Sequence, residues 1–279
     1  MKRILLTLDA LEINQNTLDF AIYIGRLTGS KITGVFLEDL VSENKIIVKD
    51  GYDATYVVWG PDETNPEYQA KLDRIQNNMN LFRDYFIKRE TECDIICEKG
   101  MPAREIIRES RFADLIIMNA QTCFKKSFRG SPTTFETQIL KAAECPVIIA
   151  PKSFSPIDEI ILCYDGSRSS FYSIKQFDYL FPEFGQTKVV LLTVNKMGTP
   201  ILPEDEKLRE WLFKRYAHIH FDFRYGKARD ELYYYLLQKN NCLVIIGAFG
   251  RNSISRLFKK TTVEKILKTT NLPIFITHP

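Results

Sequence analysis

The sequence lacks any long hydrophobic run, because no stretch approaches the ~20 apolar residues that a membrane-spanning helix needs. The first nine residues hold a short apolar run that ends at Asp9, and no small-residue cleavage site follows. This pattern favours a buried strand over a signal peptide. We therefore expect a cytoplasmic chain that has no contact with a membrane.

An excess of charge of one sign is also missing. The chain has 38 basic and 35 acidic residues, and its formal net charge is +3. Proteins that bind nucleic acids usually carry a basic patch and a high pI. We therefore do not expect nucleic acid as a partner.

Cysteine and histidine are sparse and scattered, and no Cys-x-x-Cys pair occurs. Most of the cysteines stand inside apolar runs, which favours buried thiols in a reducing compartment over disulfides or zinc. His218 and His220 stand near the start of an expected strand, and we do not expect them to bind a metal. The six cysteines are Cys93, Cys97, Cys123, Cys145, Cys163 and Cys242.

The chain contains an internal repeat. The segment 3–9 is an apolar run that ends in Asp9, and the segment 159–165 is another that ends in Asp165. Later in each copy, Gly100 is followed by Met-Pro-Ala-Arg-Glu, and Gly226 by Lys-Ala-Arg-Asp-Glu. The two glycines are 126 residues apart, whereas the two aspartates are 156 residues apart. The first copy must therefore carry about thirty extra residues near its front.

The extra residues fall at about 40–66, a segment rich in turn residues. A helix is expected next, over about 67–89, because apolar residues recur there every three or four positions. These residues are Leu72, Ile75, Met79, Phe82 and Phe86. A linker with prolines at 151 and 156 separates the copies, so the expected domains are 1–151 and 158–279.

Each copy alternates strands with helices, which predicts a mostly parallel sheet covered by helices on both faces. The expected fold is α/β, with two tandem Rossmann-like domains of five strands each. In such sheets, ligands settle in the crevice beyond the carboxyl ends of the strands. Asp9, Asp165, Asn119 and Gly247 all stand at such ends.

The second copy contains a glycine-bearing loop. Gly247 is followed by Gly250 after two residues, and after nine more residues by Lys260-Thr261; a helix and the strand phrase Leu-Pro-Ile-Phe-Ile come next. This arrangement resembles the universal stress protein family, whose ATP-binding members carry Gly-x2-Gly-x9-Gly-Ser/Thr at this place. The resemblance covers nearly all of both copies, apart from the insert. It implies the adenine nucleotide alpha hydrolase-like version of the Rossmann-like fold.

The resemblance also implies an ATP site, with Mg²⁺, in the second copy. The aspartate after the first strand would hold the adenosine, a backbone group at the end of the second strand would read adenine, and the loop would cradle ribose and phosphates. The corresponding residues are Asp165, Val194, Gly247, Gly250, Arg251 and Thr261. Glycine permits the close backbone approach, and a following helix N-terminus adds free N–H groups.

Two departures from the family pattern matter. Lys260 replaces the third glycine, and its Cβ can block the backbone approach that glycine permits. The first copy keeps Asp9 but has Asn119 and Thr122 at the first two glycine positions. We therefore expect the nucleotide, if one binds, in the second copy.

Several of these residues also have a purely structural explanation. Thr261-x-x-Glu264 and Thr133-x-x-Glu136 both fit a helix capping box. Asp165-Gly-Ser is also an ordinary turn phrase, and Gly247 with Gly250 can simply shape a loop.

Two functional hypotheses follow. The first is a non-catalytic stress-response or sensor protein that binds ATP or a related adenine nucleotide. The alternative is a ligand-free interaction module that acts through a protein partner. The two copies would pack as an internal pseudo-dimer, with the final strands 146–150 and 273–277 pairing across the interface, or would pair further as a homodimer. No Walker motif and no catalytic triad is present, so enzymatic activity beyond weak ATP hydrolysis is not expected.

Overall fold

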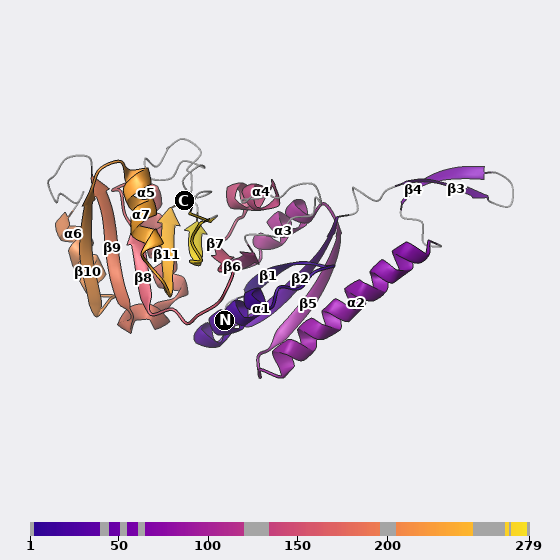
Figure 1. The fold of residues 1–279 in the computed structure, drawn as a ribbon, viewed down its shortest axis with the longest axis horizontal. Coiled ribbons are helices and arrows are strands. Elements are labelled where there is room, and N and C mark those ends of the chain that lie inside the picture. The colour runs from indigo at the N-terminus through magenta and orange to yellow at the C-terminus, as the bar shows by residue number, and fades with distance from the viewer. Residues whose placement is uncertain are drawn as a thin grey trace.

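The computed structural model describes residues 3–39, 45–50, 55–60, 65–119, 134–195, 205–247, 266–267 and 269–277. These residues form an elongated α/β molecule built around one sheet (Figure 1). The elements of the first half are β1 (Arg3–Asp9), α1 (Gln15–Thr28), β2 (Lys31–Asp39), β3 (Lys45–Asp50), β4 (Thr55–Gly60), α2 (Pro66–Ile87), β5 (Cys93–Gly100), α3 (Pro102–Ser110), β6 (Leu115–Asn119), α4 (Thr134–Ala142) and β7 (Val147–Ala150).

The second half repeats this order without the extra strands, with a short 3-10 helix added and, within the described residues, with no named counterpart of α4 between its last two strands. Its elements are β8 (Glu159–Cys163), α5 (Arg168–Leu180), the 3-10 helix η1 (Pro182–Gln186), β9 (Lys188–Asn195), α6 (Asp205–Phe213), β10 (His218–Tyr225), α7 (Ala228–Leu237), β11 (Cys242–Gly247) and β12 (Ile274–Thr277).

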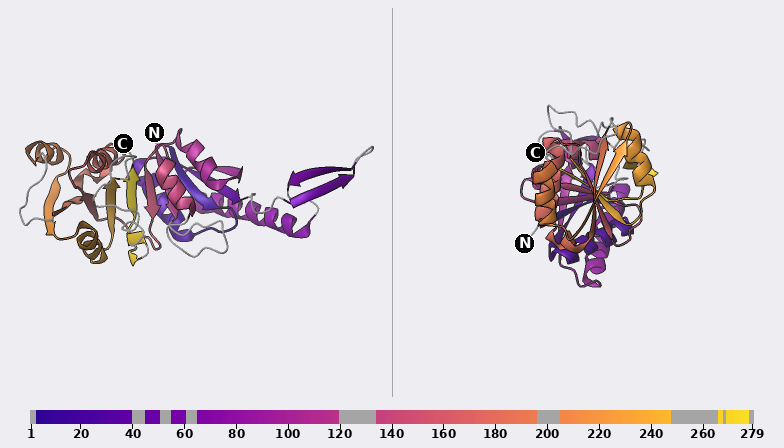
Figure 2. Two further views of the ribbon diagram at one scale, coloured as in Figure 1. Left: turned by 90° about the horizontal axis from the view of Figure 1, so that it is seen from above. Right: turned by 90° about the vertical axis from the view of Figure 1, so that its left-hand side faces the viewer.

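Ten of these strands form a single sheet in the order β10-β9-β8-β11-β12-β7-β6-β1-β2-β5. Neighbouring strands are parallel, except that β12 pairs with β7 antiparallel, with Ile274 opposite Ile149. The predicted pairing of the two final strands is therefore confirmed, and so is the α/β fold class. Figure 2 looks along this sheet and shows its strands fanning out, as expected of right-handed strand twist.

Two hydrophobic cores lie on opposite faces of the sheet, because successive strand residues point to opposite sides. On one face, Ile4 and Leu6 of β1 pack in a core with Phe20 of α1 and Phe177 of α5. On the other face, Leu5 packs with residues of α3, α4 and α7. Each core runs through both halves, which joins the two copies into one unit.

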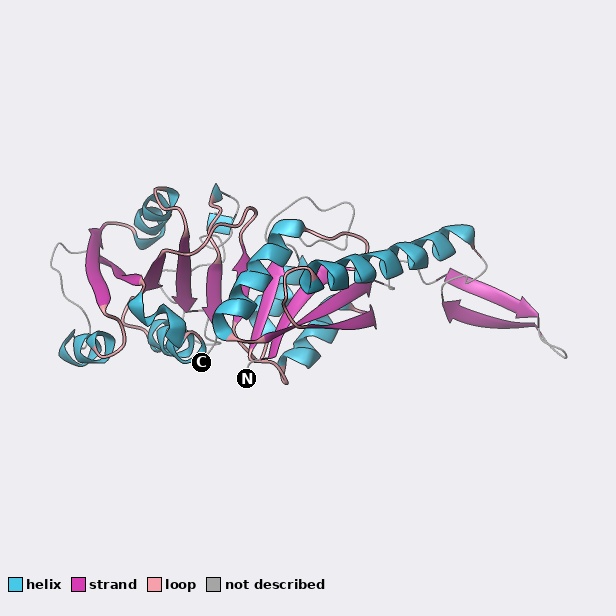
Figure 3. Ribbon diagram, turned by 90° about the horizontal axis from the view of Figure 1, so that it is seen from below, coloured by secondary structure: helices cyan, strands magenta, loops and turns pink. Residues whose placement is uncertain are grey.

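The insert contains two strands that the sequence analysis did not predict. β3 and β4 form a separate antiparallel hairpin, with Ile47 opposite Val58. The following helix α2 agrees with the prediction, and Ile75, Phe82 and Phe86 are buried along its inner stripe. Figure 3 shows the long α2 beside the sheet, with the hairpin beyond the end where α2 begins.

Within the described ranges, no helix combines the length and the apolar character that crossing a membrane requires.

Candidate functional site

The strand order places a topological switch point at one edge of each half, and this edge is called the crevice of that half below. In the second half the chain runs from β8 outward to β9 and β10, and then crosses back to β11 on the other side of β8. In the first half β1 stands in the same way between β2 and β6. Ligands of open α/β sheets bind at such switch points, beyond the carboxyl ends of the strands.

Three of the predicted site residues meet at this edge in the second half. Cys163 of β8 pairs with Leu192 of β9, and Leu162 pairs with Ile245 of β11. Asp165, Val194 and Gly247 each stand two residues beyond one of these paired positions, so they share the carboxyl edge of three adjacent strands. Gly250, Arg251 and Thr261, together with Lys260, lie outside the described residues.

Asp165 shapes the turn that leads from β8 into α5. Its Oδ1 accepts a hydrogen bond of 3.0 Å from the backbone N–H of Ser167, which is an Asx turn. Ser167 in turn caps α5, because its hydroxyl accepts a 3.1 Å hydrogen bond from the Ser170 N–H. The aspartate therefore has a structural role whether or not a ligand binds.

Asp9 has the same role in the first half. Its Oδ1 accepts a 2.8 Å hydrogen bond from the Leu11 N–H, and Asn14 caps α1. Burial raises the pKa of the Asp9 carboxyl, although the hydrogen bond from Leu11 opposes this shift. The two turns show that the repeat extends to individual side-chain contacts.

Gly247 is a point of close approach between β11 and α5. A Cβ built on Gly247 would stand 2.5 Å from the carbonyl oxygen of Ser169. The corresponding residue of the first half is Asn119, whose side-chain amide donates a 3.1 Å hydrogen bond to the Thr17 hydroxyl. The absence of a side chain at Gly247 thus has a packing explanation within the protein, independent of any ligand.

The sequence analysis missed the buried serines at the start of α5. Ser169 and Ser170 are 2% and 4% exposed, and the Ser170 hydroxyl donates to the Ser167 carbonyl at 2.9 Å. The run Ser167-Arg-Ser-Ser was the available signal, because serine favours helix N-termini. These serines fix the N-terminus of α5 beside Asp165.

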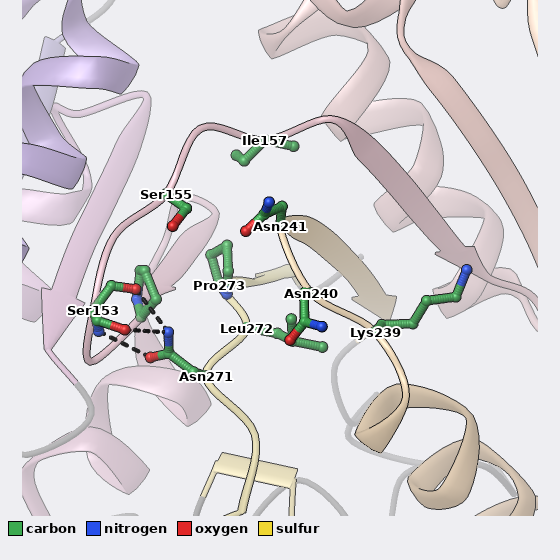
Figure 4. A pocket seen from close by; sticks show the side chains of 10 residues that line it. Ser153, Ser155, Ile157, Lys239, Asn240, Asn241, Asn271, Leu272 and Pro273 are labelled. Carbon is green, nitrogen blue, oxygen red and sulfur yellow. Dashed lines mark hydrogen bonds between the residues drawn. The ribbon is translucent and has the colours of Figure 1, made fainter.

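A small cavity lies at the opposite, amino-terminal edge of the sheet (Figure 4). It has a volume of about 60 Å³ and is lined by the linker and by residues that precede β11 and β12. Asn271 donates to the Ser153 carbonyl at 2.7 Å and accepts from the Ser153 N–H at 2.9 Å. The cavity has room for a few water molecules, and it is separate from the predicted crevice.

No set of three or more His, Cys, Asp or Glu side chains in the described part of the chain is arranged to hold a metal ion.

The fold and the position of the crevice define a double Rossmann-like α/β protein. No protein-family model matches the sequence. A universal stress protein of Synechocystis sp., Slr1230, is 21% identical over an alignment that covers 98% of this chain and 99% of that protein.

Two solved structures show the same fold over both halves. A universal stress protein from Archaeoglobus fulgidus has a TM-score of 0.66 at 17% identity, and the match covers 99% of this chain and 96% of that one. A putative universal stress protein from Pseudomonas aeruginosa has a TM-score of 0.59 at 12% identity, with coverage of 100% and 94%. The resemblance to the universal stress protein family in its tandem form is therefore confirmed.

Proposed function

We propose that this chain is a non-catalytic stress-response or sensor protein that binds ATP or a related adenine nucleotide in its second half. The observation that supports a ligand site in the second half is that residues at its switch point are accessible to solvent. Gly166 is exposed, and Asp165 and Val194 are half-buried, so a ligand can reach the edge between β8, β9 and β11.

The residues at this edge fit an adenine nucleotide in part. Asp165 can accept hydrogen bonds from ribose hydroxyls, and the end of β9 offers backbone groups to adenine. The N-terminus of α5 adds a positive dipole end at the same edge. Under this proposal Gly250, Arg251 and Thr261 cradle the phosphates, and Mg²⁺ accompanies them.

A matched pair of variants tests the proposal. Asp165→Ala and Asp9→Ala each remove one Asx turn, so both lose a similar structural contact. We expect ATP with Mg²⁺ to raise the melting temperature of the wild type and of Asp9→Ala, but not of Asp165→Ala. Equal shifts in the two variants would place the nucleotide elsewhere, and no saturable binding at millimolar ATP would refute the proposal.

The alternative function is a ligand-free interaction module, and the pairing of β12 with β7 favours it. This pairing supports an arrangement of the two halves as an internal pseudo-dimer. Under this alternative the crevice stays empty and a protein partner or a second copy binds elsewhere. Mass spectrometry of small molecules released from freshly purified protein separates the two functions, because a stoichiometric adenine nucleotide supports the first.

We further propose residues 1–151 and 158–279 as the two domains and the cytoplasm as the location. β7 ends at Ala150 and β8 begins at Glu159, which supports these boundaries. The five cysteines of the described ranges form no disulfide, and Cys145, Cys163 and Cys242 are buried. Cysteines that form no disulfide suit a reducing compartment.

A further inference from the structure

The crevices of the two halves differ in how far they are covered. In the first half, Ala10 is 0% exposed and Leu37 is 1% exposed. Their counterparts in the second half are Gly166, which is exposed, and Val194, which is half-buried. The same edge of the same fold is therefore closed in one copy and accessible in the other.

Helix α2 covers the first crevice. The side-chain amide of Asn78 donates a 2.9 Å hydrogen bond to the carbonyl of Ala10, the residue that follows Asp9. About two turns nearer the start of α2, the Lys71 ammonium lies 2.7 Å from the Glu38 carboxylate at the end of β2. The Glu38 side chain is 1% exposed in this ion pair, so solvent screens it little.

In the first half, the backbone of the residue that would contact adenine is already hydrogen-bonded within the protein. Leu37 corresponds to Val194, and its carbonyl accepts a 3.1 Å hydrogen bond from the Ala10 N–H. The turn at Asp9 is thereby tied to β2 on one side and to α2 on the other.

The helix is held in this position by its other end. Phe82 is fully buried and lies over Gly34 of β2, where an added Cβ would stand 2.6 Å from the ring. Phe82 also contacts Phe36 and Phe86, with ring centroids 5.6 Å and 4.4 Å apart. Displacing α2 would expose this aromatic cluster to water, which is unfavourable for such large apolar side chains.

Within the described residues, the second half has a shorter helix in this place. α6 spans nine residues, whereas α2 spans 22. Leu208 and Leu212 of α6 are buried in the core, as Ile75 and Phe82 of α2 are. The extra length of α2 supplies Lys71 and Asn78, which close the edge.

We propose that α2 is a permanent occupant of the first crevice, so that the chain offers one accessible crevice and not two. The first turns of α2, which carry Lys71 and Asn78, thus convert the first copy into a closed half. The count of one nucleotide per chain rests on the proposed function, whereas the closure itself does not.

Hydrogen exchange measured by mass spectrometry tests the closure without any ligand. The amides of Ala10, Leu11 and Glu12 are all hydrogen-bonded, and Ala10 carries the carbonyl that Asn78 binds. Asn78→Ala should speed their exchange about fivefold, as expected for the loss of one partly buried hydrogen bond. Asn77→Ala is the matched control, because it changes the same residue type at the exposed neighbouring position of α2. Equal exchange in the two variants would overturn the closure.

Equilibrium dialysis with labelled ATP and Mg²⁺ gives the number of sites. One nucleotide per wild-type chain is expected, and two per chain would overturn the proposal because the first crevice would then be accessible. No binding at all would refute the nucleotide function, while the exchange experiment would still decide whether α2 closes the first crevice.

Discussion

Gly247 lies directly against the backbone of Ser169, so that a Cβ at position 247 would stand 2.5 Å from the Ser169 carbonyl oxygen and 2.6 Å from its carbonyl carbon. This contact joins the end of β11 to the first turn of α5, beside Asp165. Because backbone cannot rotate away as a side chain can, any substitution must push α5 outward.

Gly247→Ala should therefore destabilise the protein by about 1–3 kcal/mol, the usual cost of overpacking. Urea unfolding followed by circular dichroism measures this loss. Asn119→Ala is the comparison in the first half, where the 3.1 Å hydrogen bond to Thr17 is lost, at a cost of about 1 kcal/mol. If the Gly247→Ala variant were as stable as the wild type, α5 could shift away from β11 without a loss of stability, which would contradict this prediction.

Gly34 and Phe82 form a second tight contact, with 2.6 Å between an added Cβ and the ring. Gly34→Ala should cost about 1–3 kcal/mol by overpacking, and Phe82→Leu should cost a similar amount through lost burial. The double variant should lose less than the sum of the two, because the smaller leucine makes room for the new methyl group. A coupling of at least about 0.5 kcal/mol in a double-mutant cycle is expected, and strict additivity would contradict the contact.

Much of the fold could be predicted because it depends on periodicity. Apolar runs that end in Asp9 and Asp165 predicted the first strand of each copy. The spacing of Ile75, Phe82 and Phe86 predicted the buried stripe of α2. The parallel order follows from the alternation of strands and helices, which leaves few arrangements.

The closed state of the first crevice could not be predicted in this way. It depends on Asn78, which reaches a carbonyl 68 positions earlier in the chain, and no local pattern records such a contact. The strands β3 and β4 were missed for a different reason. The turn residues of 49–53 and 60–66 indicated loops in the insert, although Ile46-Ile-Val48 and Tyr56-Val-Val-Trp59 beside them have strong β propensity.

The pH dependence of stability should report on Glu159, which bridges two lysines. Its carboxylate lies 2.7 Å from Lys188 and 2.6 Å from Lys239. Burial acts to raise the pKa of Glu159, but the two lysines outweigh it and hold the pKa below the ordinary value of 4.5. The ionised carboxylate therefore stabilises the fold fully above pH 4.5, and this contribution is lost as the pH falls through the lower folded-state value.

Glu159→Gln should accordingly lower the free energy of unfolding by about 1–2 kcal/mol at pH 7, since Lys188 is largely exposed and solvent weakens its share. The difference from the wild type should shrink as the pH is lowered below 4.5. Urea unfolding at several pH values measures it. Glu210→Gln is the control, because Glu210 pairs with Lys214 on an exposed helix surface and should change stability little. A difference for Glu159→Gln that stays constant down to pH 3 would contradict the assignment.

Removal of the β3–β4 hairpin should leave the rest of the molecule folded. Within the described residues the two strands form a sheet of their own, separate from the ten-stranded sheet. Deleting residues 45–60 leaves residues 40–44 and 61–64 as the connection between β2 and α2. These nine residues can span at most about 30 Å. The anchors of α2 at Phe82 and Asn78 remain, so the melting temperature should change by less than about 2 °C, whereas Phe82→Ala should lower it by about 6 °C or more. A loss on deletion as large as that of Phe82→Ala would show that the hairpin helps to hold α2 over the first crevice.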